Sequence, residues 1–410
     1  MNTLIFGIRN LQRNYRRSLV TASSIALGFA AAALFAGYTQ IVYKGLSEQA
    51  IYGELLGHLT ITKKGLTTAG RLYPEQYLFN RDVTEKISSI VHSTLADIYI
   101  APRLHLNGLI SNGRASTIFI AEGIVPRDME ILRGPRSRMS GTLEESNPTG
   151  ITVAADLAGM LGLKEGSNAV LMLNTLRNQT NALDVVIADR FSTGNAATND
   201  KFMYLPLKLA QTLYDAENSA NRLTLLGLRR MPTEADRLLL ETELKRAGFD
   251  VDIQTWQELS AFYRQVKAMF NMIFGFLLVI VLSIVVMSIA NAMNVNVNVV
   301  ERTKEIGTLR AIGMQRSGVI RLFVTEALLL VIGGCVLGLV LALLVRWGVN
   351  AADLSYQPPN ATESVPLLIG VDIGKTLIAV CLLSVLSLVS AFFPARRAAH
   401  QPVVDSLGHV

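Results

Sequence analysis

The chain has 410 residues, of which 50% are hydrophobic and 17% are charged, and its mean hydropathy is +0.36. A soluble enzyme of this length is usually less apolar and more charged, so the composition favours a membrane protein. The formal net charge is +6, and the five histidines and two cysteines show no metal-ligand or disulfide spacing. The sequence therefore predicts no metal site.

The N-terminal segment, residues 1–17, combines arginines with apolar residues at helical spacing. Leu4, Ile8, Leu11 and Tyr15 recur on the side opposite the arginines. This pattern is typical of an amphipathic helix that lies on a membrane surface. A cleaved signal peptide, including a twin-arginine signal, is the alternative. Because three more apolar segments follow the first one, we expect an uncleaved elbow helix that leads into a first membrane span.

Four apolar segments are long enough to cross a bilayer as helices, at about 1.5 Å of rise per residue. We place these spans at residues 18–40, 266–293, 319–346 and 374–393. Arginines and lysines gather before the first span, between the second and the third (residues 294–318), and in the tail after the fourth (residues 394–410). By the positive-inside rule these three regions face the cytoplasm, with both termini inside. Residues 41–265 and the short loop 347–373 are then outside.

The large outer region has the composition of a globular domain. Of the chain's 38 basic and 32 acidic residues, 24 and 25 lie within residues 41–265, which leaves 14 and 7 for the rest. The positive excess therefore belongs to the membrane part and marks its topology. For this reason we expect no nucleic acid among the partners.

Within the outer region, short strand-like runs alternate with helical ones, which predicts a mixed α+β domain. Strands are expected at residues 57–62, 116–120 and 184–188, and helices at residues 81–91, 207–214 and 232–247. The Gly- and Asn-rich residues 192–200 are predicted to form a loop. We expect two lobes, one of them inserted into the other around residues 115–200.

One short segment, from Gly370 to Thr376, looks at first like a phosphate-binding loop. That loop needs four residues between its glycines, whereas this segment has three, and it lies on the side expected to hold little ATP. We interpret it as a turn whose lysine, Lys375, anchors the fourth span. Because no other catalytic motif occurs, the sequence predicts that the chain is not an enzyme and has no catalytic residue.

The third span contains an acidic residue and two glycines. Glu326 is expected to reach the inner interface or to pair with Arg321, with an ion relay as the alternative. Gly334 and Gly338 form a small-xxx-small face that lets two helices approach closely. The spacing does not decide whether this helix packing is within one subunit or between two.

Residues 291–300 alternate asparagine and valine like a β-strand. Backbone that leaves a bilayer must nevertheless stay helical until water or protein satisfies its polar groups. We therefore predict that the second span continues as a helix through this stretch. The charged run that follows ends at Gly313, a natural helix stop. Such a helix is either a solvated loop helix or a docking surface, and these residues by themselves favour the solvated loop.

The same run resembles a motif of a known family. Residues 301–313, ERTKEIGTLRAIG, resemble the R-x-x-E-I-G-x-L-R-A-I-G segment of the FtsX-like permeases, the membrane subunits of ABC transporters of the MacB and lipoprotein-release (LolC/LolE) type. Residues 393–407 resemble the closing motif of that family, P-A-R-R-A-x-x-x-x-P-x-x-x-L. The basic N-terminal segment and the four-span layout extend the resemblance over the whole chain.

The resemblance implies a fold and a set of partners. The fold would be an α-helical membrane domain of four transmembrane helices plus an α+β extracytoplasmic domain that is two-lobed and MacB-core-like. The location would be the bacterial inner membrane, with the large domain in the periplasm. The implied partners are a cytoplasmic ABC ATPase dimer, a second permease subunit (identical or related), the lipid membrane, and a periplasmic carrier or adaptor protein. ATP and Mg would bind to the ATPase, and no cofactor would bind to this chain directly.

The resemblance also implies which residues contact the ATPase and which form the C-terminal motif. The ATPase-coupling residues would be Glu301, Arg302, Lys304, Glu305, Ile306, Gly307, Leu309, Arg310, Ala311 and Gly313. The C-terminal motif residues are Pro394, Arg396 and Arg397.

The implied function is mechanotransmission. A permease of this kind couples ATP hydrolysis by a separate ATPase to motion of the periplasmic domains, and so extracts or exports a hydrophobic or lipidated substrate. Residues 57–61 and 356–359 resemble the lipoprotein-release branch. In contrast to the macrolide exporter, we expect the ATPase to be a separate subunit and not a domain fused to this chain. The alternatives are a tripartite-efflux permease, and an ATP-driven signalling protein that regulates a periplasmic hydrolase.

Overall fold

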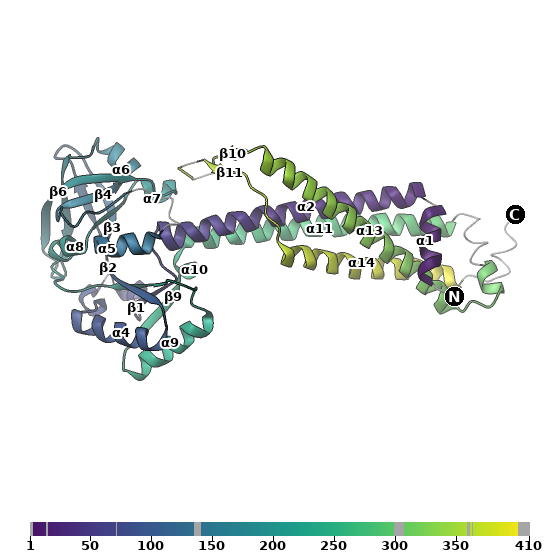
Figure 1. Ribbon diagram of the computed structural model, residues 1–410, viewed down its shortest axis with the longest axis horizontal. Helices are drawn as coiled ribbons and strands as arrows, with labels where there is room; N and C mark the ends of the chain where they lie inside the picture. Colours follow the sequence, from purple (N-terminus) through teal and green to yellow (C-terminus); the bar gives the residue numbers. More distant parts are fainter. Residues whose placement is uncertain are drawn as a thin grey trace. The chain divides into compact units, whose positions relative to one another are not determined.

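The computed structural model describes residues 3–13, 15–70, 72–134, 141–298, 307–358, 361–362 and 364–400. The chain divides into two compact units, whose elements are labelled in Figure 1. The helical unit comprises Met1–Tyr43, Val266–Ser355 and Pro366–Val410, and the α/β unit comprises Lys44–Gln265 and Tyr356–Val365. The predicted fold class is confirmed: apolar helices form one unit, and a mixed α/β sheet forms the other.

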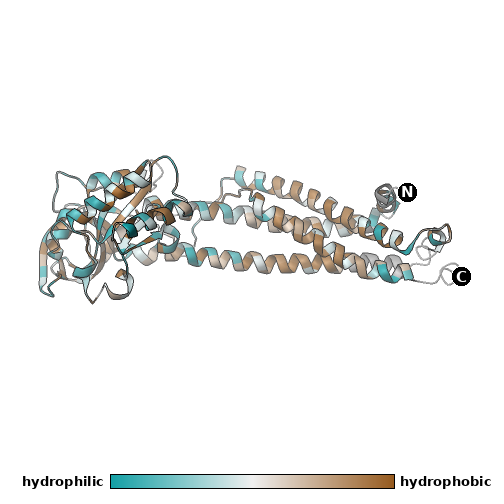
Figure 2. Cartoon of the chain, turned by 90° about the horizontal axis from the view of Figure 1, so that it is seen from below, coloured by the Kyte–Doolittle hydropathy of each residue, from teal (hydrophilic) through white to brown (hydrophobic). Residues whose placement is uncertain are grey.

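Long helices make up most of the helical unit. They are α2 (Tyr15–Glu48), α11 (Ala261–Asn298), α13 (Arg316–Ala351) and α14 (Ile373–His400), with a shorter α1 (Thr3–Arg13) before them. In the described part of the chain, four stretches are long and apolar enough to cross a membrane: Ser18–Gly53, Ala261–Ile289, Arg316–Ala351 and Ile373–Arg397. Figure 2 shows hydrophobic residues along most of their length.

The core of the helical unit joins all four long helices. Phe29 of α2, Val285 of α11, Phe323 of α13 and Leu383 of α14 are each at most 2% exposed and belong to one apolar cluster. The backbone of α11 stays helical through Asn298, as predicted for the stretch that alternates asparagine and valine. Carbonyl and N–H groups at membrane depth are satisfied within a helix, and this requirement overrides the strand-like pattern.

Helix α14 continues beyond the predicted end of the fourth span at residue 393. It passes through Pro394, although proline lacks the N–H that a helix interior uses. Ala391, Ala395 and Ala399 are completely buried at four-residue spacing. One face of the helix therefore packs continuously across the proline. The boundary predicted from hydropathy marks the end of the apolar span and not the end of the helix.

Within the described residues, nine strands form the sheet of the α/β unit, in the order β3-β7-β4-β6-β5-β2-β8-β1-β9. They are β1 (Leu59–Lys63), β2 (Ile98–Ser111), β3 (Ser116–Ile124), β4 (Gly150–Ala154), β5 (Asn168–Asn174), β6 (Thr180–Phe191), β7 (Phe202–Pro206), β8 (Arg222–Gly227) and β9 (Val251–Thr255). Strand β3 also pairs with β2, and this additional pairing closes the six strands from β2 to β3 into a barrel. Strands β8, β1 and β9 continue from β2 as an open sheet.

The barrel and the open sheet define two lobes. In the sheet lobe, α4 (Arg81–Thr94) and α9 (Glu234–Arg246) cover the open strands, and Ile61, Ile87, Leu223 and Leu240 share a core with no solvent exposure. The barrel lobe adds α5 (Pro126–Arg133), α6 (Ala155–Met160), α7 (Ala196–Asn199) and α8 (Leu207–Tyr214). The barrel lobe lies between β2 and β8 in the sequence.

Strand β2 belongs to both lobes. Its first part, from Ile98 to Arg103, pairs with β8 in the sheet lobe, and its second part, from Arg103 to Ser111, pairs with β3 in the barrel lobe. Arg103 is opposite Arg222 on one side and opposite Ile124 on the other. The two lobes therefore share one strand and meet at Arg103.

The segment 192–200 corrects the prediction of an irregular loop, because it contains the short helix α7. The side chain of Asn195 caps this helix by accepting a hydrogen bond of 3.0 Å from the backbone N–H of Ala197. Asn199 is 2% exposed and accepts a 3.0 Å bond from the N–H of Thr193. Asparagine favours helix caps as well as turns, so composition alone could not separate the two.

Candidate functional site

The two glycines of α13 lie against α2. A Cβ atom on Gly338 would be 2.5 Å from the carbonyl oxygen of Ala26 and 3.0 Å from the ring of Phe29. A Cβ atom on Gly334 would be 2.7 Å from the side chain of Ile25. No larger residue fits at these distances, so the small-xxx-small face brings the two backbones together. This is a contact within one chain.

Glu326 lies inside the helical unit, next to α1. It is 4% exposed, whereas Arg321 is exposed. A Cβ atom on Gly7 of α1 would be 3.1 Å from the side chain of Leu329 and 4.0 Å from the backbone nitrogen of Glu326. Helix α1 thus covers the turn of α13 that carries the carboxyl group. The carboxyl group is therefore held in the interior of the helical unit.

Part of the predicted ATPase-coupling segment can be described. Glu301, Arg302, Lys304, Glu305 and Ile306 lie outside the described residues.

Residues 307–313 are described, and the first five of them, 307–311, are helical. Gly307 is buried, Leu309 and Arg310 are half-buried, and Ala311 is exposed. Gly313 has a φ of +102°, the left-handed conformation that ends helices, and the N–H of Met314 returns to the carbonyl of Leu309 at 3.0 Å. Ile312 next to this stop is 79% exposed. The end of the segment therefore presents an apolar side chain to the outside.

The C-terminal motif lies on the last turns of α14. Pro394 is half-buried, and Arg396 and Arg397 are exposed. The arginines lie away from the face that carries the buried alanines. Their positive charges lie near the C-terminus of the helix, where they interact favourably with the negative end of the helix dipole.

Lys375 has internal partners that account for its charge. Its ammonium group donates a 3.0 Å hydrogen bond to the hydroxyl of Thr39 and lies 4.0 Å from a carboxylate oxygen of Asp372. It also lies 5.0 Å from the ring centre of Tyr43 and 5.4 Å from that of Phe274. These contacts join α14 to α2 and α11. The lysine binds protein groups and is not displayed for a phosphate.

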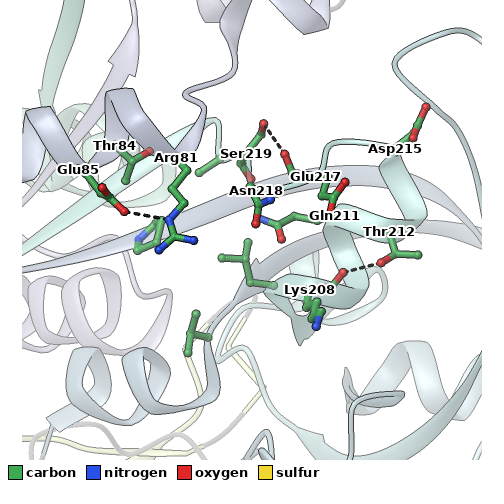
Figure 3. Close-up of a pocket in the computed structure, with 14 residues that line it drawn as sticks. Arg81, Thr84, Glu85, Lys208, Gln211, Thr212, Asp215, Glu217, Asn218 and Ser219 are labelled. Carbon is green, nitrogen blue, oxygen red and sulfur yellow. Dashed lines mark hydrogen bonds and ion pairs between the residues drawn. The ribbon is translucent and has the colours of Figure 1, made fainter.

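A cleft of about 700 Å³ opens between the two lobes of the α/β unit (Figure 3). Its walls are α4 and α8, and residues 215–220 close one end. The polar groups bind one another: Arg81 donates to Glu85 at 2.9 Å, and Gln211 donates to the carbonyl of Ser219 at 2.9 Å. Among the described residues, no group of three or more His, Cys, Asp or Glu side chains could hold a metal ion.

A buried charge cluster, which sequence reasoning missed, lies where the lobes meet. The Glu122 carboxylate, 3% exposed, is 3.1 Å from Arg103, 3.1 Å from Arg222 and 2.8 Å from Nδ1 of His105. Burial alone would raise the pKa of Glu122, but the positive charges of Arg103 and Arg222 and the contact with His105 together hold it well below its usual 4.5. Glu122 is thus ionised at neutral pH and binds groups from both lobes.

The helical unit carries a domain of a known family. Residues 275–403 match the FtsX-like permease C-terminal family. This range includes α13, α14, the ATPase-coupling segment and most of the C-terminal motif.

Relatives resemble this chain over part of their length. An uncharacterised ABC transporter permease of Methanocaldococcus jannaschii is 25% identical over 214 residues, which cover 51% of each chain. A macrolide export ATP-binding/permease protein MacB of a Shewanella species is 35% identical over 127 residues, which cover 31% of this chain and 18% of the relative. The chain thus spans about half, or less, of the curated relatives that it matches. The periplasmic region of MacB from Actinobacillus actinomycetemcomitans aligns with a TM-score of 0.35 at 12% identity, over 51% of this chain and 92% of that one.

Replacing Gly338 by leucine should separate α13 from α2. The new side chain has no space beside Ala26, and overpacking of this kind costs about 1–3 kcal/mol. We expect a lower melting temperature for the full chain in detergent. Gly333→Leu is the matched control, because a Cβ atom at that neighbouring glycine meets nothing within 4 Å. Equal melting temperatures for the two variants would contradict the packing role.

Glu122→Gln should reduce stability in a pH-dependent way. At neutral pH the change leaves the buried Arg103 and the half-buried Arg222 without their anion, at a cost of about 3–5 kcal/mol. Because the folded-state pKa lies below the usual 4.5, the carboxylate contributes fully above that pH, and its contribution is lost as the pH falls further. The gap in melting temperature between wild type and variant should therefore be widest at neutral pH and shrink below about pH 4.5. A gap that stays constant down to acid pH would refute this assignment.

Proposed function

We propose that this chain, whose residues 275–403 form an FtsX-like permease domain, is the membrane subunit of an ABC transporter. A separate cytoplasmic ATPase dimer binds ATP and Mg and docks on residues 301–313. The α/β unit is periplasmic, and both termini are in the cytoplasm of a bacterial cell. The observation that carries this proposal is that the family match includes the charged segment that ends at Gly313, next to an isoleucine that is 79% exposed.

The helical unit offers a path for force from the ATPase side. The ATPase-coupling segment leads directly into α13, which meets α2 at Gly334 and Gly338. Helix α2 also contacts α11, because Phe35 stacks on Phe274 with ring centres 6.4 Å apart and meets Phe270 at 6.0 Å. Helices packed this closely move as a group rather than singly. Both α2 and α11 continue in the chain into the α/β unit, so a displacement of α13 is passed on to that unit.

The cargo in this proposal is a hydrophobic or lipidated molecule that is extracted or exported from the inner membrane, as in lipoprotein release. Residues 57–61 and 356–359 support this branch by their resemblance to it. A second permease subunit completes the transporter, and a periplasmic carrier or adaptor protein receives the cargo. In this proposal the chain transmits motion from the ATPase to the α/β unit (mechanotransmission), and the ATPase partner hydrolyses ATP.

Tripartite efflux is the second candidate function. It is favoured by relatives that are named macrolide export and pyoverdine export ATP-binding/permease proteins. Efflux and lipoprotein release differ in the cargo and in the periplasmic partner. Crosslinking the α/β unit to periplasmic proteins in cells distinguishes them, because an adaptor of an efflux pump and a lipoprotein carrier are different captured species.

Substitutions in the ATPase-coupling segment should uncouple the chain from its ATPase. The full chain should copurify with an ABC ATPase from its own cells, and Ile312→Asp should weaken this association, because it places a charge on an exposed apolar side chain. Glu305→Lys should do the same by reversing a charge, and both variants should lower stimulated ATP hydrolysis by about tenfold or more, the scale of a lost interface contact.

The control for this experiment is Gln315→Ala, an exposed position just beyond the helix stop, which should leave both association and hydrolysis unchanged. Melting temperatures should be equal for all these variants. A chain that captures no ATPase, together with silent substitutions, would overturn the proposed function.

A further inference from the structure

The chain enters the α/β unit through an unusual turn at the end of α2. This exit turn, residues 49–57, begins as the π-helical turn η1 (Gln49–Gly53). It then places Leu55 and Gly57 in the left-handed region, with φ angles of +57° and +62°. A left-handed conformation is unfavourable for leucine because its Cβ crowds the backbone, and Leu55 is fully buried. Such a conformation persists only where the surrounding structure fixes it.

Buried donors from the barrel lobe bind the carbonyl groups of the exit turn. The hydroxyl of Tyr204 on β7, a residue 1% exposed, donates to the carbonyl of Gly53 at 3.2 Å. The guanidinium of Arg103 on β2, 2% exposed, donates through Nη1 to the carbonyl of Leu55. Carbonyls at the end of a helix have no partner within the helix, so these side chains satisfy groups that would otherwise be buried alone. Burial raises the pKa of Tyr204, so its hydroxyl remains a donor at neutral pH.

The exit turn is also tied to the sheet lobe, through Gly57 and through His58, the residue that follows it. The N–H of His58 donates to the carbonyl of Leu225 on β8 at 2.8 Å, and the N–H of Gly227 donates to Nδ1 of His58 at 2.9 Å. At Gly57 a Cβ atom would be 2.7 Å from the carbonyl oxygen of Leu225, so the backbone approaches β8 as closely as glycine allows.

Arg103 connects these two attachments. Its Nη1 binds the exit turn, while its Nη2 binds Glu122, which in turn binds Arg222 of the sheet lobe. A guanidinium can do both because its N–H groups point in fixed, different directions, and an ammonium group has no such geometry. The two N–H groups of Arg103 therefore reach Leu55 and Glu122 only when the exit turn and β3 have the positions seen here.

We propose that Arg103, Glu122, Arg222 and Tyr204 form a three-way joint that locks the exit turn to both lobes, so that the exit turn and the two lobes move as one body. The joint is a positioning device with no catalytic part. Its role in transport rests on the proposed function, because only an ATP-driven displacement of α2 gives it a force to transmit. The joint itself exists in the resting protein and can be tested without a partner.

Hydrogen exchange of the full chain in detergent tests the joint. The N–H groups of Leu56 and Gly57 donate back to Ala50 and Ile51 at 3.2 Å each, and they report directly on the exit turn. Arg103→Lys keeps a positive charge but cannot bind Glu122 and Leu55 together. We expect exchange at Leu56 and Gly57 to become at least about tenfold faster, while β4 and β6 stay protected, as in a local opening.

The second variant is Tyr204→Phe, which removes one hydroxyl and keeps the buried ring. If Arg103→Lys unfolds the chain, Tyr204→Phe alone tests the joint. Faster exchange that is confined to the exit turn supports the joint, and unchanged exchange at the exit turn overturns it. The matched control is Arg237→Lys. Arg237 also binds a carboxylate, Glu234 at 2.5 Å, and a carbonyl, Ile253 at 3.2 Å, but it lies at the surface of the sheet lobe. This control should leave the exit turn protected.

Failure of the joint and failure of the proposed function give different results. If the joint transmits force, Tyr204→Phe should retain ATPase binding and basal hydrolysis but lose transport of a lipidated probe, a fluorescent triacylated peptide in vesicles. If exchange at the exit turn increases while the chain binds no ATPase, the joint stands and the proposed function falls. If exchange is unchanged in both variants, the joint falls, whatever the transport result.

Discussion

The buried ion pair between Arg103 and Glu122 is the interaction on which the arrangement of the α/β unit depends. Removing two charges from water is expensive, and their mutual attraction offsets this cost only when geometry is good and the remaining hydrogen-bonding groups are satisfied. Here the carboxylate has Arg103, Arg222 and His105 within 3.1 Å. Oε2 of Glu122 and Nε of Arg103 nevertheless make no hydrogen bond within the described residues. The ion pairs of Glu122 with Arg103 and Arg222 therefore hold the open sheet and the closed barrel together at this carboxylate.

The helical unit is held together differently, because contacts between apolar helix surfaces are similar in several registers and do not select one of them. Registry comes instead from small residues and from a few polar contacts. Gly334 and Gly338 set the approach of α13 to α2, and Lys375 ties α14 to Thr39 and to the aromatic rings of Tyr43 and Phe274. Close backbone contact between α13 and α2, together with the contacts of Lys375 at the N-terminal end of α14, holds the helices of the unit in fixed positions.

Features that follow from local physics could be predicted from the sequence. Bilayer thickness predicts the apolar spans, and the need to satisfy backbone groups predicts the helical course of α11 to Asn298. Gly313 predicts the end of the short helix at residues 307–311, because glycine adopts the left-handed conformation easily. The joint could not be predicted, because Leu55, Arg103, Glu122 and Arg222 are far apart in the sequence and none of them belongs to a pattern. Hydropathy does not predict how far α14 extends beyond the apolar span, since the helix continues through Pro394 with three buried alanines on one face. Most of the charged half of the ATPase-coupling segment lies outside the described residues, so its role stays a prediction.

The sharing of strand β2 limits how the two lobes can diverge in evolution or be exchanged in the laboratory. Side chains alternate between the two faces of a strand, so inserting or deleting one residue near Arg103 would turn the following side chains to the wrong face in the barrel lobe. A chimera that takes its barrel from a relative must therefore be spliced inside β2 with the count of residues preserved. The hairpin turn after Ser111 offers more freedom, because Gly113 meets nothing within 4 Å and length changes there leave both ladders aligned.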